Sequence, residues 1–376
     1  MKVICAPDKF KGCLSAATAA QAMARGIRRA LPEAEIDVCP VADGGEGTVE
    51  AIIAATGGEL RHDEVTGPLG QKVQAAWGMS PDGPTAVIEM AAAAGLELVP
   101  PDRRDPTRTT TFGVGELIAC AIDAGATRII LGIGGSATCD GGCGVAAALG
   151  AQFFTDDSQG LQSVDCTGGD LHRITIIRDN DVVRQRVAGC DIRVACDVTN
   201  PLTGLEGAAY VYAPQKGATA EQVELLDRGL RHLASLWREQ LGIDVEALPG
   251  AGAAGGLGGG LVAFLHASLV PGIALVLDAV NFEQRVADCG LCLTGEGRID
   301  GQTASGKACI GVAQAAQRHG VPTIALVGGI GPDANRTLQA GLREYHVIGE
   351  GLSLEESMRR AEELIEATAQ RVVAGF

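Results

Sequence analysis

Residues 128–142 read RIILGIGGSATCDGG, and this stretch predicts the fold class. Residues 129–131 form an apolar run that is typical of a buried strand. The glycines and hydroxyls that follow, together with Asp140, predict a loop and a helix that begins near Gly141. In open α/β sheets, ligands bind beyond the carboxyl ends of parallel strands, where backbone N–H groups attract anions. The stretch therefore predicts a parallel strand that delivers a loop to a small anionic molecule.

The composition limits the kinds of partner that the chain can have. A length of 376 residues favours two domains, each with its own core. The 30 basic and 46 acidic residues give a net charge of −16, which repels nucleic acid and anionic membrane surfaces. A small anionic ligand must then be held locally by backbone amides, individual Lys or Arg side chains, or a metal ion.

The cysteines and the longest uncharged segment argue against a secreted or membrane protein. The 12 cysteines are scattered through apolar runs, and the chain begins with the strand-like MKVICAPDKF, so we expect reduced thiols in a cytoplasmic protein. Residues 249–277 contain no charged side chain but are broken by Pro271. We expect a glycine-rich loop, a buried helix and a buried strand at 273–277 in place of a membrane span.

The order of strand and helix patterns predicts an α/β protein with two domains. Strand-like and helical runs alternate at both ends of the chain, with Ser15 as the N-cap of the first helix. Residues 60–100 have the pattern of hairpin strands. A polar irregular segment follows the helix expected at 143–150 and extends to about residue 190. We expect residues 1–60 and 287–376 to form a discontinuous α/β domain with a mostly parallel, Rossmann-like sheet. Residues 61–286 form an inserted α/β domain with a mixed sheet, and the active-site cleft lies between the two domains.

Five loops place glycine or proline beside a carboxylate at the expected ends of strands. Two of them add cations, Lys9 and Lys11 in one and Arg298 in another. Carboxylates for Mg²⁺, amide nests and positive donors are what phosphoryl transfer requires, although ordinary turns and helix caps use the same residues. The loops are PDKFKG (7–12), ADGGEG (42–47), GIGGSATCDGG (132–142), ACDVTNP (195–201) and TGEGRIDGQ (294–302).

Two familiar motifs lack the context that they need, and a third is absent from the sequence. GQTASGK at 301–307 fits GxxxxGK, but Ala308 stands where a P-loop has Ser or Thr. GAGAAG at 250–255 fits GxGxxG, but a polar segment with Pro249 precedes it where a strand is required. No GxSxG occurs, and the six histidines lack a partner motif for nucleophilic hydrolysis.

At these loops the sequence resembles the glycerate kinase type I family of bacteria. The resemblance runs in order from residue 1 to about 330. It implies two α/β domains and ATP-dependent phosphorylation of D-glycerate with Mg²⁺, giving 2-phosphoglycerate and ADP. The motifs are APDKFKGCLSA (6–16), PVADGGEGTVEA (40–51), VTGPLGQKV (65–73), GIGGSATCDGG (132–142), VACDVTNPL (194–202), PQKGA (214–218), PGAGAAGGLG (249–258) and LTGEGRIDGQTASGKACIGVA (293–313).

Loop chemistry and resemblance together assign the nucleotide site to the loop after residue 131. We expect the backbone amides of Gly134, Gly135 and Ser136 to bind ATP phosphates, with the helix that begins near Gly141 adding its dipole. Asp140 either ligates the metal or caps that helix. A further cofactor-binding candidate is Lys307, which opens a later helix.

The remaining assignments concern the acceptor and the metal. Either Asp43 or Asp197 is the base for the acceptor hydroxyl, and the sequence does not choose between them. Lys11 and Arg298 are expected to clamp the substrate carboxylate and the moving phosphoryl group. Lys11 is preferred over Lys9, because Lys9 stands where the family usually has serine. Glu46 and Asn200 complete the substrate-binding candidates, and the metal candidates are Glu296 and Asp300.

Two other functions compete with a kinase. GAGAAG would suit an NAD-dependent reductase of hydroxypyruvate or tartronate semialdehyde. A non-catalytic protein could bind a sugar acid or nucleotide with the same loops. Several Mg²⁺-capable carboxylates beside cations favour the kinase, because a binding module has no use for them.

Overall fold

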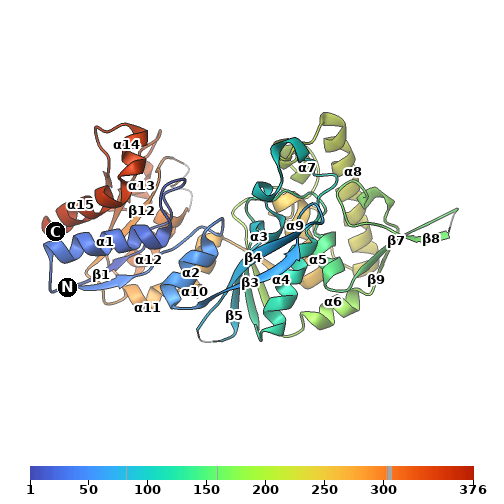
Figure 1. Ribbon diagram of the computed structural model, residues 1–376, viewed down its shortest axis with the longest axis horizontal. Coiled ribbons are helices and arrows are strands. Elements are labelled where there is room, and N and C mark those ends of the chain that lie inside the picture. The colour runs from blue at the N-terminus through green and yellow to red at the C-terminus, as the bar shows by residue number, and fades with distance from the viewer. Residues whose placement is uncertain (82, 159, 302, 304–306) are drawn as a thin grey trace. The chain divides into compact units, whose positions relative to one another are not determined.

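The computed structural model describes residues 1–81, 83–158, 160–301, 303 and 307–376. The chain forms two compact units (Figure 1). Unit 1 consists of Met1–Asp43, Gly47–Gly58 and Gly272–Phe376. Unit 2 consists of Gly44–Glu46 and Glu59–Pro271, so the terminal segments make one unit and the middle of the chain makes the other.

Unit 1 is built on a five-stranded sheet in which every pair of neighbours is parallel. This confirms the predicted parallel, Rossmann-like sheet from the terminal segments. The strand order is β14-β13-β12-β1-β2. The strands are β1 (Lys2–Cys5), β2 (Glu35–Val38), β12 (Leu291–Glu296), β13 (Thr323–Val327) and β14 (Glu344–Val347).

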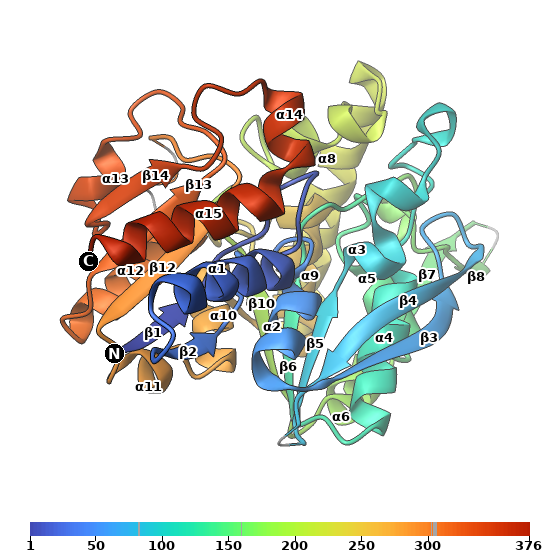
Figure 2. The same cartoon turned by 60° about the vertical axis from the view of Figure 1, so that its left-hand side comes forward.

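Helices cover both faces of the unit 1 sheet. Figure 2 shows α1 (Ala16–Ala30) beside α15 (Ala361–Ala374) over one face, where both pack on β1, β12 and β13. Alternate residues of β13, Ala325 and Val327, turn to the other face and pack with α12 (Ala308–Arg318). The remaining helices of the unit are α2 (Thr48–Thr56), α10 (Gly272–Ala279), α11 (Phe282–Val286), α13 (Arg336–Gln339) and α14 (Leu354–Arg359).

Local signals at the first helix act as the sequence predicts. The Ser15 side chain caps α1 by accepting a hydrogen bond from the Thr18 amide at 3.3 Å. Gly26 permits the close approach of α1 and α15, because a Cβ atom there would lie 2.2 Å from the Glu366 carbonyl oxygen. The first helix, α1, therefore packs against the last helix, α15, at a position where a side chain larger than that of glycine cannot fit.

The segment 272–286 differs from the prediction. The expected strand at 273–277 is wrong, since these residues lie in α10. A run that is apolar throughout has no hydrophobic periodicity, so its sequence does not distinguish a buried strand from a buried helix. The same segment belongs to unit 1 and not to the middle of the chain, because α10 and α11 contact α12.

Unit 2 contains the predicted mixed sheet, in the order β11-β10-β6-β5-β4-β3. The first four strands are parallel, and β4 and β3 are antiparallel to their neighbours, as the hairpin pattern at 60–100 predicts. The strands are β3 (Glu59–Thr66), β4 (Lys72–Met79), β5 (Thr85–Glu89), β6 (Arg128–Gly132), β10 (Asp191–Ala195) and β11 (Ser268–Val270). The helices are α3 (Ala91–Ala94), α4 (Phe112–Asp123), α5 (Cys143–Ala148), α6 (Asn180–Arg186), α7 (Ala208–Tyr212), α8 (Ala220–Leu236) and α9 (Ala253–Leu265).

The polar segment after residue 150 is more regular than expected. It contains a small antiparallel sheet of β7 (Gln152–Asp157), β8 (Gly160–Ser163) and β9 (Ile176–Arg178). The prediction of irregular structure is wrong here because these strands are short and mostly exposed, so they carry little hydrophobic alternation. Phe153 anchors this sheet by packing edge-to-face on Phe264, with ring centroids 5.9 Å apart.

All twelve cysteines are free thiols. Within the described residues, none of the helices combines the length and the apolar character needed to cross a membrane.

Candidate active site

Asp8 and Glu296 leave the unit 1 sheet side by side at its carboxyl edge. β1 pairs in parallel with β12, so the loops that follow both strands start at the same edge. The Asp8 amide donates a hydrogen bond to the Gly295 carbonyl oxygen at 2.8 Å, which carries the pairing one step beyond the strand. Glu296 is one of the predicted metal residues, whereas Asp8 is not among the predicted site residues, although it stands in the first of the five loops.

Both carboxyl groups are held in a poorly solvated place. Burial raises the pKa of Asp8 to about 7, and the charge of Asp43 adds to the shift. Burial likewise raises the pKa of Glu296 to about 7, with Asp8 and Asp43 contributing, while Lys307 opposes the shift at both groups. We call Asp8, Asp43 and Glu296 the carboxyl cluster. A group with a pKa near neutrality can hold or release a proton at physiological pH.

Glu296 fits a metal ligand better than Asp300 does. Its Oε1 atom is buried and, within the described residues, has no hydrogen-bond partner. Asp300 closes a turn instead: its Oδ1 accepts a hydrogen bond from the Thr303 amide at 3.2 Å, and its own amide donates to Thr303 Oγ1 at 3.1 Å. In the described parts of the chain, no group of three or more His, Cys, Asp or Glu side chains could hold a metal ion by itself.

The two predicted clamps lie on neighbouring loops of unit 1. Lys11 is exposed in the turn between β1 and α1. A Cβ atom added at Gly297 would lie 3.3 Å from the Lys11 amide nitrogen, so the backbone before Arg298 passes beside Lys11. The exposed Arg298 side chain lies over Gly331, because a Cβ there would be 2.8 Å from Nη2. Lys307 is exposed at the N-cap of α12.

In unit 2, three segments meet at the carboxyl edge of the parallel strands. Glu89 at the end of β5 and Ala195 at the end of β10 both pair with Gly132 of β6. The 134–136 loop and Asp197 therefore follow these strand ends at one edge, and Glu89, which the sequence analysis does not name, lies there too. Asp197 is exposed.

Glu46 reaches the same edge through its own turn. The segment Gly44–Glu46 belongs to unit 2, whereas Asp43 belongs to unit 1. A Cβ atom on Gly132 would lie 2.5 Å from the Gly44 carbonyl oxygen, so only glycine fits at that crossing. The predicted substrate residue Glu46 is consequently exposed on a turn packed against the strand end that leads into the 134–136 loop.

The 134–136 loop, predicted to bind ATP phosphates, is exposed at its two glycines. Gly134 and Gly135 are exposed, and Gly135 adopts a left-handed conformation with φ 76°. The Gly135 carbonyl accepts a hydrogen bond from the Leu96 amide at 2.8 Å, and the Ala137 amide donates to Ala94 O at 2.9 Å. The loop is thus fixed on its inner side and open to solvent at its glycines.

Asp140 and Gly141, by contrast, are buried behind this loop. Asp140 Oδ2 accepts hydrogen bonds from the Thr111 amide at 2.7 Å, from the Thr111 hydroxyl at 2.8 Å and from the Gly144 amide at 3.3 Å. Its Oδ1 accepts from the Gly142 amide at 3.2 Å. Asp140 thus accepts bonds from amides at and beside the start of α5, whose N-cap residue is Gly142. A Cβ on Gly141 would lie 2.6 Å from Leu233, so this glycine faces α8.

The Asn200 side chain is engaged within its own loop. Its Nδ2 donates a hydrogen bond to the Glu206 carbonyl at 2.7 Å, and its Oδ1 accepts one from the Tyr212 hydroxyl at 2.6 Å. Asn200 therefore shapes the segment after β10.

Lys216, like Asp8, is not among the predicted site residues. Its side chain is 2% exposed, and its Nζ donates hydrogen bonds to Ser136 Oγ at 2.6 Å and to the Thr138 carbonyl at 2.7 Å. Burial lowers its pKa to about 8. The quoted motif PQKGA contains this lysine, but its contact with a loop 80 residues away has no local signal.

GAGAAG lacks the strand that a dinucleotide fingerprint requires. The motif enters α9 directly, and residues 242–249 before it contain no strand. It packs beneath the 134–142 region, where a Cβ on Gly255 would lie 2.0 Å from the Thr138 carbonyl oxygen. Of GQTASGK, Gln302 and residues 304–306 lie outside the described residues.

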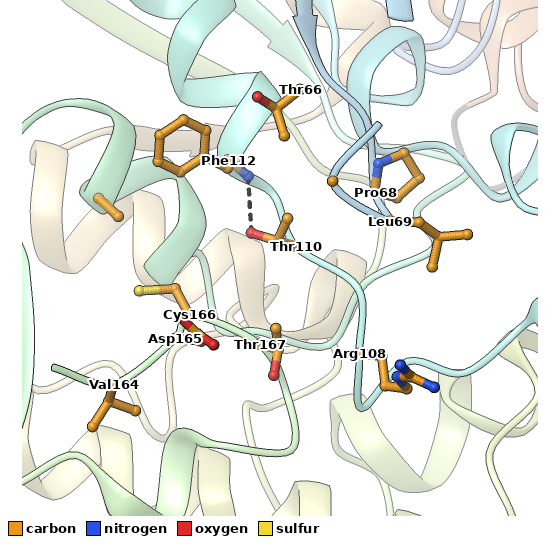
Figure 3. A pocket seen from close by; sticks show the side chains of 12 residues that line it. Thr66, Pro68, Leu69, Arg108, Thr110, Phe112, Val164, Asp165, Cys166 and Thr167 are labelled. Carbon is orange, nitrogen blue, oxygen red and sulfur yellow. Dashed lines mark hydrogen bonds between the residues drawn. The ribbon is translucent and has the colours of Figure 1, made fainter. Parts of the chain in front are cut away.

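A half-open cavity of about 530 Å³ lies elsewhere in unit 2 (Figure 3). It is lined by the β3–β4 turn, the start of α4 and residues 164–167. Arg108 and Thr110 line it, whereas the alternate residues Thr109 and Thr111 bond to Ala137 and Asp140 on the other side of the same segment. The Thr107–Thr111 segment thus separates this cavity from residues 137–140.

Comparisons with known proteins show the family to which the chain belongs. The family model described as the glycerate kinase family matches residues 3–376. The chain is 48% identical to the glycerate 2-kinase of Escherichia coli (strain K12), over 100% of this chain and 97% of the relative. It is 48% identical to the glycerate kinase of Bacillus subtilis (strain 168), over 100% and 98%. A crystal structure from Salmonella typhimurium LT2, described as a glycerate kinase 2, superposes with a TM-score of 0.90 at 47% identity, covering 100% of this chain and 98% of that one. The chain therefore belongs to the glycerate kinase family.

Proposed function

We propose that the protein transfers the γ-phosphoryl group of ATP to the 2-hydroxyl group of D-glycerate, giving 2-phosphoglycerate and ADP. Family membership makes the protein a kinase that phosphorylates glycerate. The choice of the 2-hydroxyl is supported by the 48% identity to a protein named glycerate 2-kinase. The observation that carries the chemistry is the carboxyl cluster beside Lys307. In it the pKa values of Asp8 and Glu296 are raised to about 7, and the charge of Asp43 contributes to both shifts.

In this proposal Asp43 accepts the proton of the attacking hydroxyl. It is half-buried and lies close enough to Asp8 and Glu296 to raise the pKa of both, whereas the rival Asp197 is exposed. A base shielded from water competes better for the substrate proton, because no solvent hydrogen bonds must be displaced first.

The cations and the glycine loop take the charged parts of the substrates. Lys11 and Arg298 hold the glycerate carboxylate and the moving phosphoryl group, and Glu46 assists in substrate binding. The amides of Gly134, Gly135 and Ser136 hold ATP phosphates. Lys307 balances the charge of the carboxyl cluster, and Asp300 keeps the Arg298 loop in shape.

The chemistry of the donors also fits Mg²⁺. The buried, unpartnered Oε1 of Glu296 would hold it, with the neighbouring Asp8 as the second carboxylate. Mg²⁺ in kinases is bound by one or two carboxylates plus substrate phosphates, so a complete cage of protein ligands is not needed. When bound, the ion neutralises charge on the phosphates of ATP.

The test is an assay with the purified full chain, ATP, Mg²⁺ and D-glycerate. We expect ADP release that depends on glycerate, and ³¹P NMR of the product should give the signal of 2-phosphoglycerate. L-glycerate and omission of glycerate serve as controls for non-productive ATP hydrolysis. ADP release that is independent of glycerate, or 3-phosphoglycerate as the product, would refute the proposal.

A further inference from the structure

Lys216 connects the middle of unit 2 to the proposed phosphate loop. It ends a short 3₁₀ helix, η4 (Pro214–Lys216), and its Nζ reaches Ser136 Oγ and the Thr138 carbonyl at 2.6 and 2.7 Å. Ser136 is itself one of the residues proposed to bind ATP phosphates. The lysine therefore lies beneath the loop whose glycines are exposed above it.

The direction of the Lys216 side chain is fixed by the turn that carries it. Gly217 follows with φ 96°, and a Cβ atom there would lie 2.3 Å from the Arg104 carbonyl oxygen. The amides of Lys216 and Ala218 both donate hydrogen bonds to the Ala213 carbonyl, at 3.0 and 3.1 Å. The lysine is thus held before any ligand binds, which reduces the entropy lost on binding.

Within the described residues, Lys216 forms no direct ion pair with a carboxylate. The groups whose charges favour its protonated form, Cys139 and Asp140, both belong to the loop region. Burial raises the pKa of the Cys139 thiol to about 12, so it is neutral, and both oxygens of Asp140 accept bonds from backbone amides. Within the described residues, both hydrogen bonds of Lys216 go to neutral oxygens. A buried ammonium held in this way is costly unless an anion comes near.

We propose that Lys216 is a positioning residue that fixes the 134–138 loop and places a positive charge beneath it, so that the loop binds a polyphosphate chain in preference to the singly charged glycerate. The inference rests on the proposed binding of ATP phosphates by this loop and names the chemistry that selects them. Neutral amides alone would attract any small anion, whereas a cation behind them adds attraction that grows with the charge of the ligand.

The test compares Lys216→Met with Lys216→Arg, using inorganic tripolyphosphate in calorimetry and ATP in the kinase assay. For K216M we expect a roughly 10-fold or larger rise in the tripolyphosphate Kd and in the KM for ATP, with the KM for glycerate changed less than about 2-fold. K216R should recover most of the loss, because it keeps the charge. Lys72→Met, at an exposed lysine of the same unit, is the matched control and should leave both constants unchanged.

A purely structural lysine would give a different pattern. It would lower Tm in K216M but leave tripolyphosphate binding intact in the folded fraction, and that outcome overturns the inference. If K216M does not fold, Ser136→Ala removes the one side-chain bond to Lys216 on the proposed phosphate loop, and we expect an approximately 3-fold or larger rise in the same two constants. An unchanged Kd in S136A then overturns it.

The outcomes also separate this inference from the proposed function. Glycerate-dependent ADP release together with unchanged tripolyphosphate binding in K216M refutes the role of Lys216 and leaves the kinase proposal standing. Weaker tripolyphosphate binding in K216M without any turnover of glycerate supports the role of Lys216 and refutes the kinase proposal.

Discussion

The carboxyl edges of the two parallel sheets carry their charges in opposite ways. In unit 1 the edge holds poorly solvated acidic side chains, the buried Asp8 and the half-buried Glu296, with exposed cations around them. In unit 2 the cation, Lys216, is buried, and an exposed glycine backbone lies above it. In the function proposed above, the same strand-to-loop topology serves proton chemistry in one unit and anion recognition in the other. The difference arises from which sign of charge the packing removes from water.

The largest expected effect separates the two candidate bases. We expect Asp43→Asn to lower kcat/KM for glycerate by roughly 10³-fold, because a general base contributes about 10²–10⁴-fold. Asp197→Asn, its matched counterpart on unit 2, should lower it by less than about 5-fold, because the proposal gives it no proton to carry. ADP release at saturating ATP measures both. A larger loss of kcat/KM in D197N than in D43N would indicate that Asp197, and not Asp43, is the base.

The carboxyl cluster should also reduce stability at neutral pH. Burial keeps Asp8 protonated up to a pKa of about 7 in the folded state, whereas the unfolded chain loses that proton near pH 4. Between these values the folded state binds the extra proton, so stability falls as pH rises from about 4 to 7. Asp8→Asn should raise the free energy of unfolding by about 2–4 kcal/mol at pH 8 and leave it nearly unchanged near pH 4.

Urea unfolding with EDTA at the two pH values measures this effect. Asp288→Asn is the control, since the pKa of that exposed carboxyl is lowered by its hydrogen bond to Lys2 and the variant should show no gain at pH 8. An equal change in the free energy of unfolding of D8N at both pH values would mean that ionisation of Asp8 is not the source of the destabilisation.

The Arg298 clamp should have a smaller effect than the base. Removing a bidentate charge contact costs about 2 kcal/mol, so Arg298→Ala should lower kcat/KM for glycerate by roughly 30-fold. Arg371→Ala, at an exposed position of α15, is the control and should behave like the parent protein. Unaltered kcat/KM in R298A would remove this arginine from the substrate site.

The smallest effect tests the shape of the glycine loop. Gly135 has φ 76°, which is unfavourable for alanine, whereas a Cβ there would lie 3.6 Å from Ala91, an ordinary contact. Gly135→Ala therefore introduces backbone strain without a steric clash. We expect a loss of about 1 kcal/mol in unfolding free energy. Gly134→Ala lacks the positive φ and would place its Cβ 3.4 Å from Gly45, so it should cost only a few tenths of a kcal/mol. Equal losses in the two variants would contradict the assigned conformation.

Local sequence signals account for much of the fold. The strand at 128–132, the Ser15 cap and the alternating pattern at both ends all appear where the residues predict them. The strand expected at 273–277 is a helix, because a uniformly apolar run has no period to read. The sequence does not predict the small sheet around β7, because exposed strands need no hydrophobic alternation.

For the site, the sequence by itself predicted the five candidate loops, because glycine or proline and a carboxylate beside a strand end form a local pattern. It could not determine the environment of each group. Only the tertiary structure places Asp8 and Glu296 together in a poorly solvated environment. It also brings backbone amides to the oxygens of Asp140 and places the Lys216 ammonium against Ser136. The physical reason is that desolvation and charge coupling depend on neighbours that are distant in the chain, so they exist only after the sheets have formed.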